Sequence, residues 1–261
     1  MPVTVDHEFV CMSQDQFAAV AYELMNLAFQ IHHELGPLFD EKVYQKALAS
    51  RIKGIQTEVR IDVKFRDFRK TFFIDIVAAS GAIFELKTVE RLNSKHRGQL
   101  LNYLLLTGQK HGKLINFRSQ HIQHEFVNSP VCAAKRFKFS VDDSRWFATD
   151  GFGVAEKMLV VELLSEWGTG LSRRLYEEAI VHLCCGTQNA LSDVDVALDG
   201  VVIAKQQMLL CAKRSALRVT SFDHGSGGYS NDLTRLIKRT DIDHVQWVNI
   251  DLGVLSFTTL G

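Results

Sequence analysis

The sequence predicts an α/β protein with two tandem domains, each a mixed central sheet flanked by helices. Helical and strand patterns alternate along the chain, the same order of patterns occurs twice, and the length of 261 residues allows two small domains. We place the domains at residues 1–130 and 131–261, with repeats over 15–127 and 150–260 joined by a connector at 128–149. The connector is rich in Phe and Trp, so we expect it to pack rather than to form a flexible linker.

The first repeat begins with two predicted helices. Residues 15–35 carry apolar side chains three and four positions apart, which is the spacing of one helix face, and Gly36 with Pro37 ends this helix. A second helix is expected over 40–53, with Gly54 as its C-terminal stop. Helices of this kind flank the sheet of an α/β domain.

Strand patterns follow these helices. Apolar and polar residues alternate over 59–65, which indicates a strand, and residues 71–89 contain two β-rich runs joined near Ser80-Gly81, which indicates a hairpin. The remaining elements are a helix over 96–107 and strands over 114–117 and 121–127.

A nearly constant offset relates the two halves of the chain. At an offset of 132 positions, Gly36, Tyr44 and Ala47 meet Gly168, Tyr176 and Ala179. Later the offset is 133, and it pairs Val63 with Val196, Leu86 with Val219, and residues 115–117 with 248–250. The shared order of elements and the one-residue drift indicate a tandem duplication.

The composition excludes several classes of protein. Hydrophobic residues make up 46% and charged residues 23%, which excludes collagen-like and disordered chains. Lys+Arg and Asp+Glu both number 30, so any binding of nucleic acid must come from a local patch. No apolar run approaches the roughly 20 residues of a membrane span, and the N-terminus does not resemble a signal peptide. Five cysteines, an odd number, argue against a disulfide framework, so we expect a cytoplasmic protein.

One group of residues in the first repeat predicts chemistry. Asp75 lies in the first strand of the hairpin, and Glu85, Leu86 and Lys87 lie in the second, with the spacing D-x9-E-x-K. Residues two apart on a strand face the same side, so Glu85 and Lys87 project together, and the hairpin brings Asp75 beside them. Two carboxylates and the carbonyl of Leu86 suit Mg²⁺, while the lysine can orient or help deprotonate water, or offset charge on a phosphate.

The alternative is a solvated strand face with a surface ion pair. The apolar flanks in FFIDIV and IFELK argue against it, because charges within buried strands need a metal or a partner. Two further pairs share a helix face: Glu41 with Tyr44, and Gln99 with Tyr103. Taken singly, each pair is also explained by a surface carboxylate or a core tyrosine.

The segments IHHELGPLFDEKVYQKAL, FFIDIVAASGAIFELKTV and QLLNYLLLTGQKHGKLINF resemble the GxxExxY proteins of the PD-(D/E)XK nuclease superfamily, whose RecB-type members share a Q-x-x-x-Y helix. The resemblance covers about residues 20–120 and implies a restriction-endonuclease-like domain with a mixed four-stranded sheet core. It also implies site roles. Asp75 and Glu85 would bind Mg²⁺ or Mn²⁺, Lys87 would serve the attacking water, Glu41 would bind or water-bridge the metal, and Gln99 and Tyr103 would support the site or touch the nucleic acid. The family's name-giving glycine falls on Leu38, which removes no catalytic group.

The second repeat lacks every proposed catalytic residue. The offsets convert Glu41, Asp75, Glu85, Lys87, Gln99 and Tyr103 to Arg173, Met208, Arg218, Thr220, Asp232 and Leu236. Met and Arg cannot replace carboxylate ligands of Mg²⁺, so a second copy of the same fold would be a degenerate pseudo-nuclease. One hypothesis is that Arg173 and Arg218 bind phosphates near the vacated site. The plainer hypothesis is structural: the second repeat packs on the first as the partner in a homodimer would. Whether two copies of the whole chain form a homodimer is a separate possibility.

These observations favour a Mg²⁺-dependent nuclease, with DNA favoured over RNA as its partner. The alternatives are a catalytically silent module that binds nucleic acid or protein, and a metal-dependent phosphoesterase acting on a small substrate. The Gly-rich segment 223–232 precedes a helix but lacks a following Lys-Ser/Thr pair, so we interpret it as a flexible connection rather than a phosphate loop.

Overall fold

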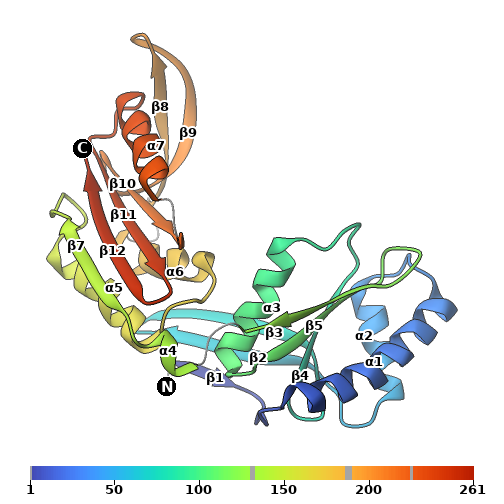
Figure 1. The fold of residues 1–261 in the computed structure, drawn as a ribbon. Helices are drawn as coiled ribbons and strands as arrows, with labels where there is room; N and C mark the ends of the chain where they lie inside the picture. Colours follow the sequence, from blue (N-terminus) through green and yellow to red (C-terminus); the bar gives the residue numbers. More distant parts are fainter. Residues whose placement is uncertain (1, 130–132, 186–189, 224–225) are drawn as a thin grey trace. The chain divides into compact units, whose positions relative to one another are not determined.

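The computed structural model describes residues 2–129, 133–185, 190–223 and 226–261. It divides into two compact units, the first made of Met1–Lys64 and Arg69–Ala133, and the second of Phe65–Phe68 and Ala134–Gly261. Each unit has a six-stranded mixed sheet flanked by helices, which confirms the predicted fold class (Figure 1). Within the described residues, no helix has the length and apolar character that crossing a membrane requires.

The first sheet has the strand order β1-β2-β3-β4-β5-β6, in which β4 runs antiparallel to β3 and parallel to β5. It is therefore wider than the four-stranded core that the family resemblance implied. The strands are β1 (Val3–Val5), β2 (Gln56–Phe65), β3 (Phe68–Ala78), β4 (Ala82–Lys87), β5 (His111–Asn116) and β6 (Gln123–Asn128), and the helices are α1 (Gln14–Leu35), α2 (Glu41–Arg51) and α3 (Ser94–Thr107).

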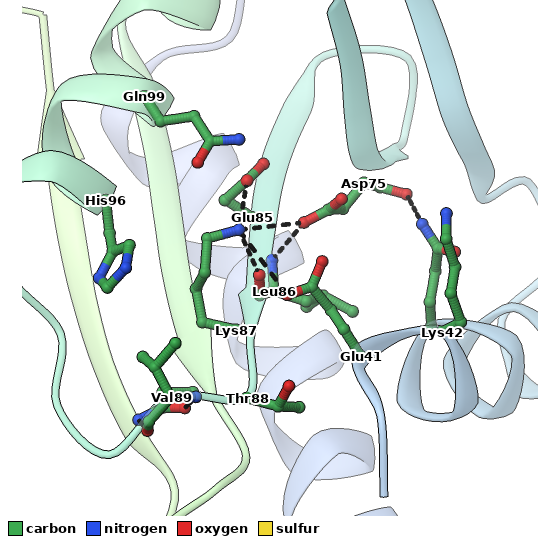
Figure 2. A network of polar contacts seen from close by, with 12 residues as sticks. Glu41, Lys42, Asp75, Glu85, Leu86, Lys87, Thr88, Val89, His96 and Gln99 are labelled. Carbon is green, nitrogen blue, oxygen red and sulfur yellow. Dashed lines mark hydrogen bonds and ion pairs between the residues drawn. The ribbon is translucent and has the colours of Figure 1, made fainter.

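The two faces of the first sheet are covered by different helices. Phe84 and Leu86 of β4 pack in the main core with buried residues of α1 and α2, such as Ile31 and Tyr44. Since side chains alternate along a strand, Glu85 and Lys87 project to the opposite face, where α3 lies (Figures 1 and 2). These two site residues therefore lie on the α3 side of the sheet.

Helix caps explain where the observed ends differ from the predicted ones. Ser13 and Gln16 form a capping box that starts α1 at Gln14. Asn93 accepts hydrogen bonds from the backbone N–H groups of Lys95 and His96, so α3 starts at Ser94 rather than at residue 96. The remaining predicted elements of the first repeat are present with shifts of a few residues at their ends.

The second unit has the strand order β7-β12-β11-β10-β9-β8. Its elements are α4 (Ala133–Arg136), β7 (Ser140–Arg145), α5 (Val154–Trp167), α6 (Arg173–Ile180), the π-helix Val181–Cys185, β8 (Leu191–Leu198), β9 (Val201–Ala212), β10 (Ser215–Thr220), α7 (Ser226–Lys238), β11 (His244–Asp251) and β12 (Val254–Leu260). The connector thus contributes a strand, because β7 pairs in parallel with β12.

The Gly-rich segment is not the flexible connection that its composition predicts. Of its residues, 224 and 225 lie outside the described part, but α7 begins at Ser226 and includes Gly227 and Gly228. The apolar residues Leu233 and Leu236 of the same helix pack in the core of the second unit, and this packing outweighs the poor helix propensity of glycine. The prediction was therefore wrong from Ser226 onward.

Strand pairing follows the same register in the two units. Glu85 of β4 pairs with Leu114 of β5, and Arg218 of β10 pairs with Trp247 of β11, which is the same pair displaced by 133 positions. Ile115 with His124 and Val248 with Phe257 repeat this displacement in the next strand pair.

Two buried polar contacts also recur. The Tyr44 hydroxyl donates to the Gly36 carbonyl at 2.5 Å, and the Tyr176 hydroxyl donates to the Gly168 carbonyl at 2.5 Å. The Asn116 side chain accepts from the N–H of Val89 and donates to its carbonyl, and Asn249 does the same with Phe222.

Candidate active site

Asp75 and Glu85 meet on neighbouring strands of the first sheet. The pair Ile76–Phe84 ends the recorded ladder between β3 and β4, and Asp75 and Glu85 come next in that register. Both carboxylates are buried, with 9% and 1% of the residue exposed. The Asp75 Oδ2 atom accepts a 2.7 Å hydrogen bond from the N–H of Leu86, which fixes the carboxylate against β4.

Lys87 lies among three carboxylates (Figure 2). Its Nζ atom is 2.6 Å from Glu85 Oε1, 4.0 Å from Asp75 Oδ2 and 3.8 Å from Glu41 Oε2. It also donates a 2.7 Å hydrogen bond to the Leu86 carbonyl. Because Glu41 is the first residue of α2, helix and hairpin meet at this ammonium group. The structure thus brings Glu41, Asp75, Glu85 and Lys87 together.

The cluster carries more negative charge than Lys87 neutralises, and the pKa values reflect this imbalance. Burial raises the pKa of Glu85 well above its ordinary value, and the neighbouring Asp75 adds to the increase. Burial also raises the pKa values of Asp75 and Glu41. For Lys87, burial acts to lower the pKa, but the attraction of Glu85, Asp75 and Glu41 outweighs it and raises the pKa overall.

One oxygen of this cluster has no partner in the part of the chain that the structure describes. Glu85 Oε2 is buried and makes no hydrogen bond to any described residue. A buried carboxylate oxygen without a partner carries a full desolvation cost, which a bound cation would offset. Within the described ranges, no three His, Cys, Asp or Glu side chains are grouped so that they could hold a metal ion. Two carboxylates, a carbonyl and water nevertheless suit Mg²⁺, which usually binds proteins through one or two carboxylates and keeps several waters.

Gln99 and Tyr103 occupy one face of α3, as predicted. Gln99 Nε2 donates a 3.0 Å hydrogen bond to the Tyr103 hydroxyl, and the Gln99 amide points toward Glu85 (Figure 2). Burial raises the pKa of Tyr103, and the charge of Glu85 raises it further, so this hydroxyl stays protonated at neutral pH. The structure therefore places both side chains beside the carboxylates. Tyr44, by contrast, is a core residue whose hydroxyl binds backbone groups.

Sequence reasoning missed a second layer of polar contacts behind Asp75. Gln45 donates to the Asp75 carbonyl at 2.8 Å and to Glu58 Oε1 at 2.7 Å, and Lys42 pairs with Glu58. The position of Gln45, four residues after Glu41 on α2, was the signal available for it. No sequence signal was available for Glu58. Its backbone has a positive φ of 55°, which is uncommon for a residue other than glycine, so local preference does not predict its conformation.

A family model described as the PD-(D/E)XK nuclease superfamily matches residues 18–128. Apart from Phe65–Phe68, this match lies within the first unit, and it contains all six predicted site side chains, namely Glu41, Asp75, Glu85, Lys87, Gln99 and Tyr103. No curated protein and no solved structure gives a match to the chain. Residues 18–128 are therefore similar to the PD-(D/E)XK nuclease superfamily, and the mixed sheet with its flanking helices agrees with this match.

Proposed function

We propose that the first unit hydrolyses phosphodiester bonds of nucleic acid with the help of a divalent cation, and that DNA is favoured over RNA. The observation that carries this proposal is the buried cluster of Asp75, Glu85 and Lys87, in which Glu85 Oε2 has no partner among the described residues. Charged side chains are rarely buried without a functional reason, and the family match supplies the class of reaction.

Asp75, Glu85 and the Leu86 carbonyl would hold Mg²⁺ or Mn²⁺. All three offer oxygen, the ligand atom that these cations prefer. When bound, such a cation polarises a phosphate and lowers the pKa of its water. Glu41 lies next to Lys87 and would bind the cation directly or through a water molecule.

The remaining side chains would position the reactants. Lys87 is a charged donor close to both carboxylates, so it orients the attacking water and offsets negative charge on the phosphate. Gln99 and Tyr103, linked by their hydrogen bond, support Glu85 from α3 or contact the nucleic-acid strand. Gln45 fixes the backbone of Asp75 and so keeps its carboxylate facing β4.

Substrate class is tested by comparing cleavage of single-stranded DNA, the matching RNA and a small aryl phosphodiester, each with Mg²⁺ and with Mn²⁺. Faster cleavage of DNA than of RNA supports the proposal as stated. RNA as the better substrate would correct the choice of nucleic acid, and cleavage of the small ester alone would replace the nuclease by a phosphoesterase.

For the second unit, we infer a degenerate copy of the same domain. The shared strand register and the two recurring buried contacts, Tyr44–Gly36 with Tyr176–Gly168 and Asn116–Val89 with Asn249–Phe222, support a common origin. The catalytic positions do not recur, so this unit would not bind a metal in the manner of the first. Homodimer formation stays a prediction, which sedimentation of the full chain tests.

The second candidate function is a silent module that binds nucleic acid or protein. It is favoured by the ion pair between Lys87 and Glu85, because that pair already neutralises part of the charge that a metal would neutralise. Binding of DNA without cleavage under any divalent cation would select this alternative.

A further inference from the structure

The second unit contains a pocket at the position that corresponds to the candidate active site of the first. Its volume is about 630 Å³, within the range typical of small-molecule sites. It is lined by the beginning of α6, by β10 and by α7, which correspond to α2, β4 and α3 of the first unit (Figure 1). Among its lining residues are Arg173 and Arg218, the counterparts of Glu41 and Glu85.

Arg218 is the residue that gives this pocket its chemistry. It is half-buried between buried neighbours on β10, and its side chain makes no hydrogen bond or ion pair to any described residue. Other half-buried cations have partners; Lys157, for example, pairs with Asp143. A guanidinium group held in a pocket without a counter-ion matches an anion with several oxygens, above all a phosphate, which it can bind through two hydrogen bonds.

Arg173 adds a second, partly neutralised cation. Its Nη1 atom is 3.4 Å from the Val219 carbonyl, and its guanidinium also pairs with Glu177. Val219 is the counterpart of Leu86, whose carbonyl is a candidate metal ligand in the first unit. The second unit therefore has an arginine guanidinium group beside the carbonyl that corresponds to the one proposed to bind the metal ion in the first unit.

The opposite wall of the pocket is aromatic and apolar. Tyr229 contacts Phe222 edge to face, with ring centroids 5.0 Å apart, and Leu233 and Leu236 of α7 extend this surface. Aromatic side chains in such a wall can stack on a nucleobase, which contributes affinity without requiring one sequence. Asp232 also lines the pocket, where its carboxylate pairs with Arg235 at 3.4 Å, so part of its charge is neutralised within α7.

We propose that this pocket binds a nucleotide, with its phosphate on Arg218 and Arg173 and its base against Tyr229 and Phe222. The ligand is either a free nucleotide or one nucleotide of a single strand. This inference goes beyond the proposed function and does not depend on cleavage by the first unit.

The test is calorimetric titration of the full chain in EDTA with adenosine monophosphate, inorganic phosphate and a 5′-phosphorylated oligonucleotide. The variants are Arg218→Gln and Arg218→Lys, and the matched control is Arg174→Gln, which removes an exposed arginine of α6 that pairs with Glu178 and does not line the pocket. We expect Arg218→Gln to weaken nucleotide binding at least about tenfold, Arg218→Lys to lose less, and the control to stay within about twofold.

Several results would overturn the proposal. One is wild-type protein that binds neither nucleotide nor oligonucleotide, and another is Arg218→Gln binding as tightly as wild type. Inorganic phosphate binding as tightly as the nucleotide would remove the role of the aromatic wall. Tighter binding of the oligonucleotide, lost in Arg218→Gln, identifies a strand as the ligand, and nucleotide binding without it identifies a free nucleotide. Equal thermal midpoints for the variants show that a loss of affinity is not a loss of fold.

Discussion

The two units share their scaffold and differ in the charges that it carries. At three equivalent positions the first unit has Glu41, Asp75 and Glu85, and the second has Arg173, Met208 and Arg218. The strand registers around Glu85 and Arg218 are the same. Met208 is buried, with 1% exposed, so an apolar side chain occupies the place of a carboxylate.

This difference shows which residues the fold requires. The buried tyrosine and asparagine contacts occur in both units because they satisfy backbone groups at turns and loops that would otherwise be buried without partners. The acidic cluster occurs in one unit alone. On the proposed function, the cluster serves chemistry and costs the first unit stability, and the following predictions test this proposal.

The largest expected effect is on catalysis. Glu85→Gln keeps the shape of the side chain but removes its charge, so we expect cleavage by the first unit to fall by about 1,000-fold or more. Glu34→Gln is the control, since Glu34 belongs to a half-exposed ion pair with Arg51 outside the site. Initial rates of oligonucleotide cleavage measure both variants. A Glu85→Gln protein that keeps a tenth of the activity would contradict the assignment of Glu85.

Lys87→Met separates metal binding from catalysis. In the structure the Lys87 ammonium group donates to Glu85 Oε1 and to the Leu86 carbonyl, two of the oxygens proposed to hold the divalent metal ion. We expect cleavage to fall about 100-fold, while Mg²⁺ affinity measured by calorimetry at pH 8 stays the same or increases. The alkaline pH favours the ionised form of Glu85, because removal of Lys87 takes away a charge that lowers the pKa of this carboxyl. A parallel loss of metal affinity would make Lys87 part of the metal site instead.

Because the two units share the tyrosine contact, loss of its hydroxyl should lower the stability of each unit by a similar amount. Tyr44→Phe and Tyr176→Phe each remove a hydroxyl that bonds backbone groups in the core, so each should lower the free energy of unfolding by about 1–2 kcal/mol. The control is Tyr22→Phe, because Tyr22 is 70% exposed. Chemical denaturation gives these values. A cost in one unit without the other would show that the recurring contact is not a common structural requirement.

The smallest effect is on stability as a function of pH. Because the folded-state pKa of Glu85 is raised, the folded state binds more protons than the unfolded state between the ordinary and the raised pKa. Stability of the first unit should therefore fall as the pH increases through this range. Glu85→Gln should flatten this fall, so the free energy of unfolding of the variant should exceed that of wild type at the alkaline end of the range. The pKa of Glu34 is instead lowered by its hydrogen bond to Arg51, so its ionised form favours the folded state. Glu34→Gln should therefore not be more stable than wild type.

Much of the site followed from strand geometry alone. Alternation placed Glu85 and Lys87 on one face, and the hairpin brought Asp75 to them, so the distances among these side chains express a pattern visible in the sequence. Helix periodicity likewise placed Gln99 beside Tyr103. These predictions depend on local spacing, which the sequence contains directly.

What escaped prediction depends on contacts distant in sequence. The edge strands β1 and β7 have few buried residues, so no apolar pattern marks them. Gln45 acts through a backbone carbonyl of another strand, and Glu58 through an unusual backbone conformation. Helix α7 forms at a glycine-rich segment because its later turns pack in the core. In each case tertiary packing, rather than local preference, determines the outcome.

The central claim is that the acidic cluster of the first unit is a working metal site. Calorimetric titration of wild type and of Asp75→Ala with Mg²⁺ and Mn²⁺, together with cleavage of single-stranded DNA, tests it most directly. We predict that wild type binds a divalent cation and cuts the strand, and that Asp75→Ala loses both. Wild-type protein that binds no cation and cuts no strand would contradict the claim and would make Asp75, Glu85 and Lys87 remnants of a site that the protein no longer uses.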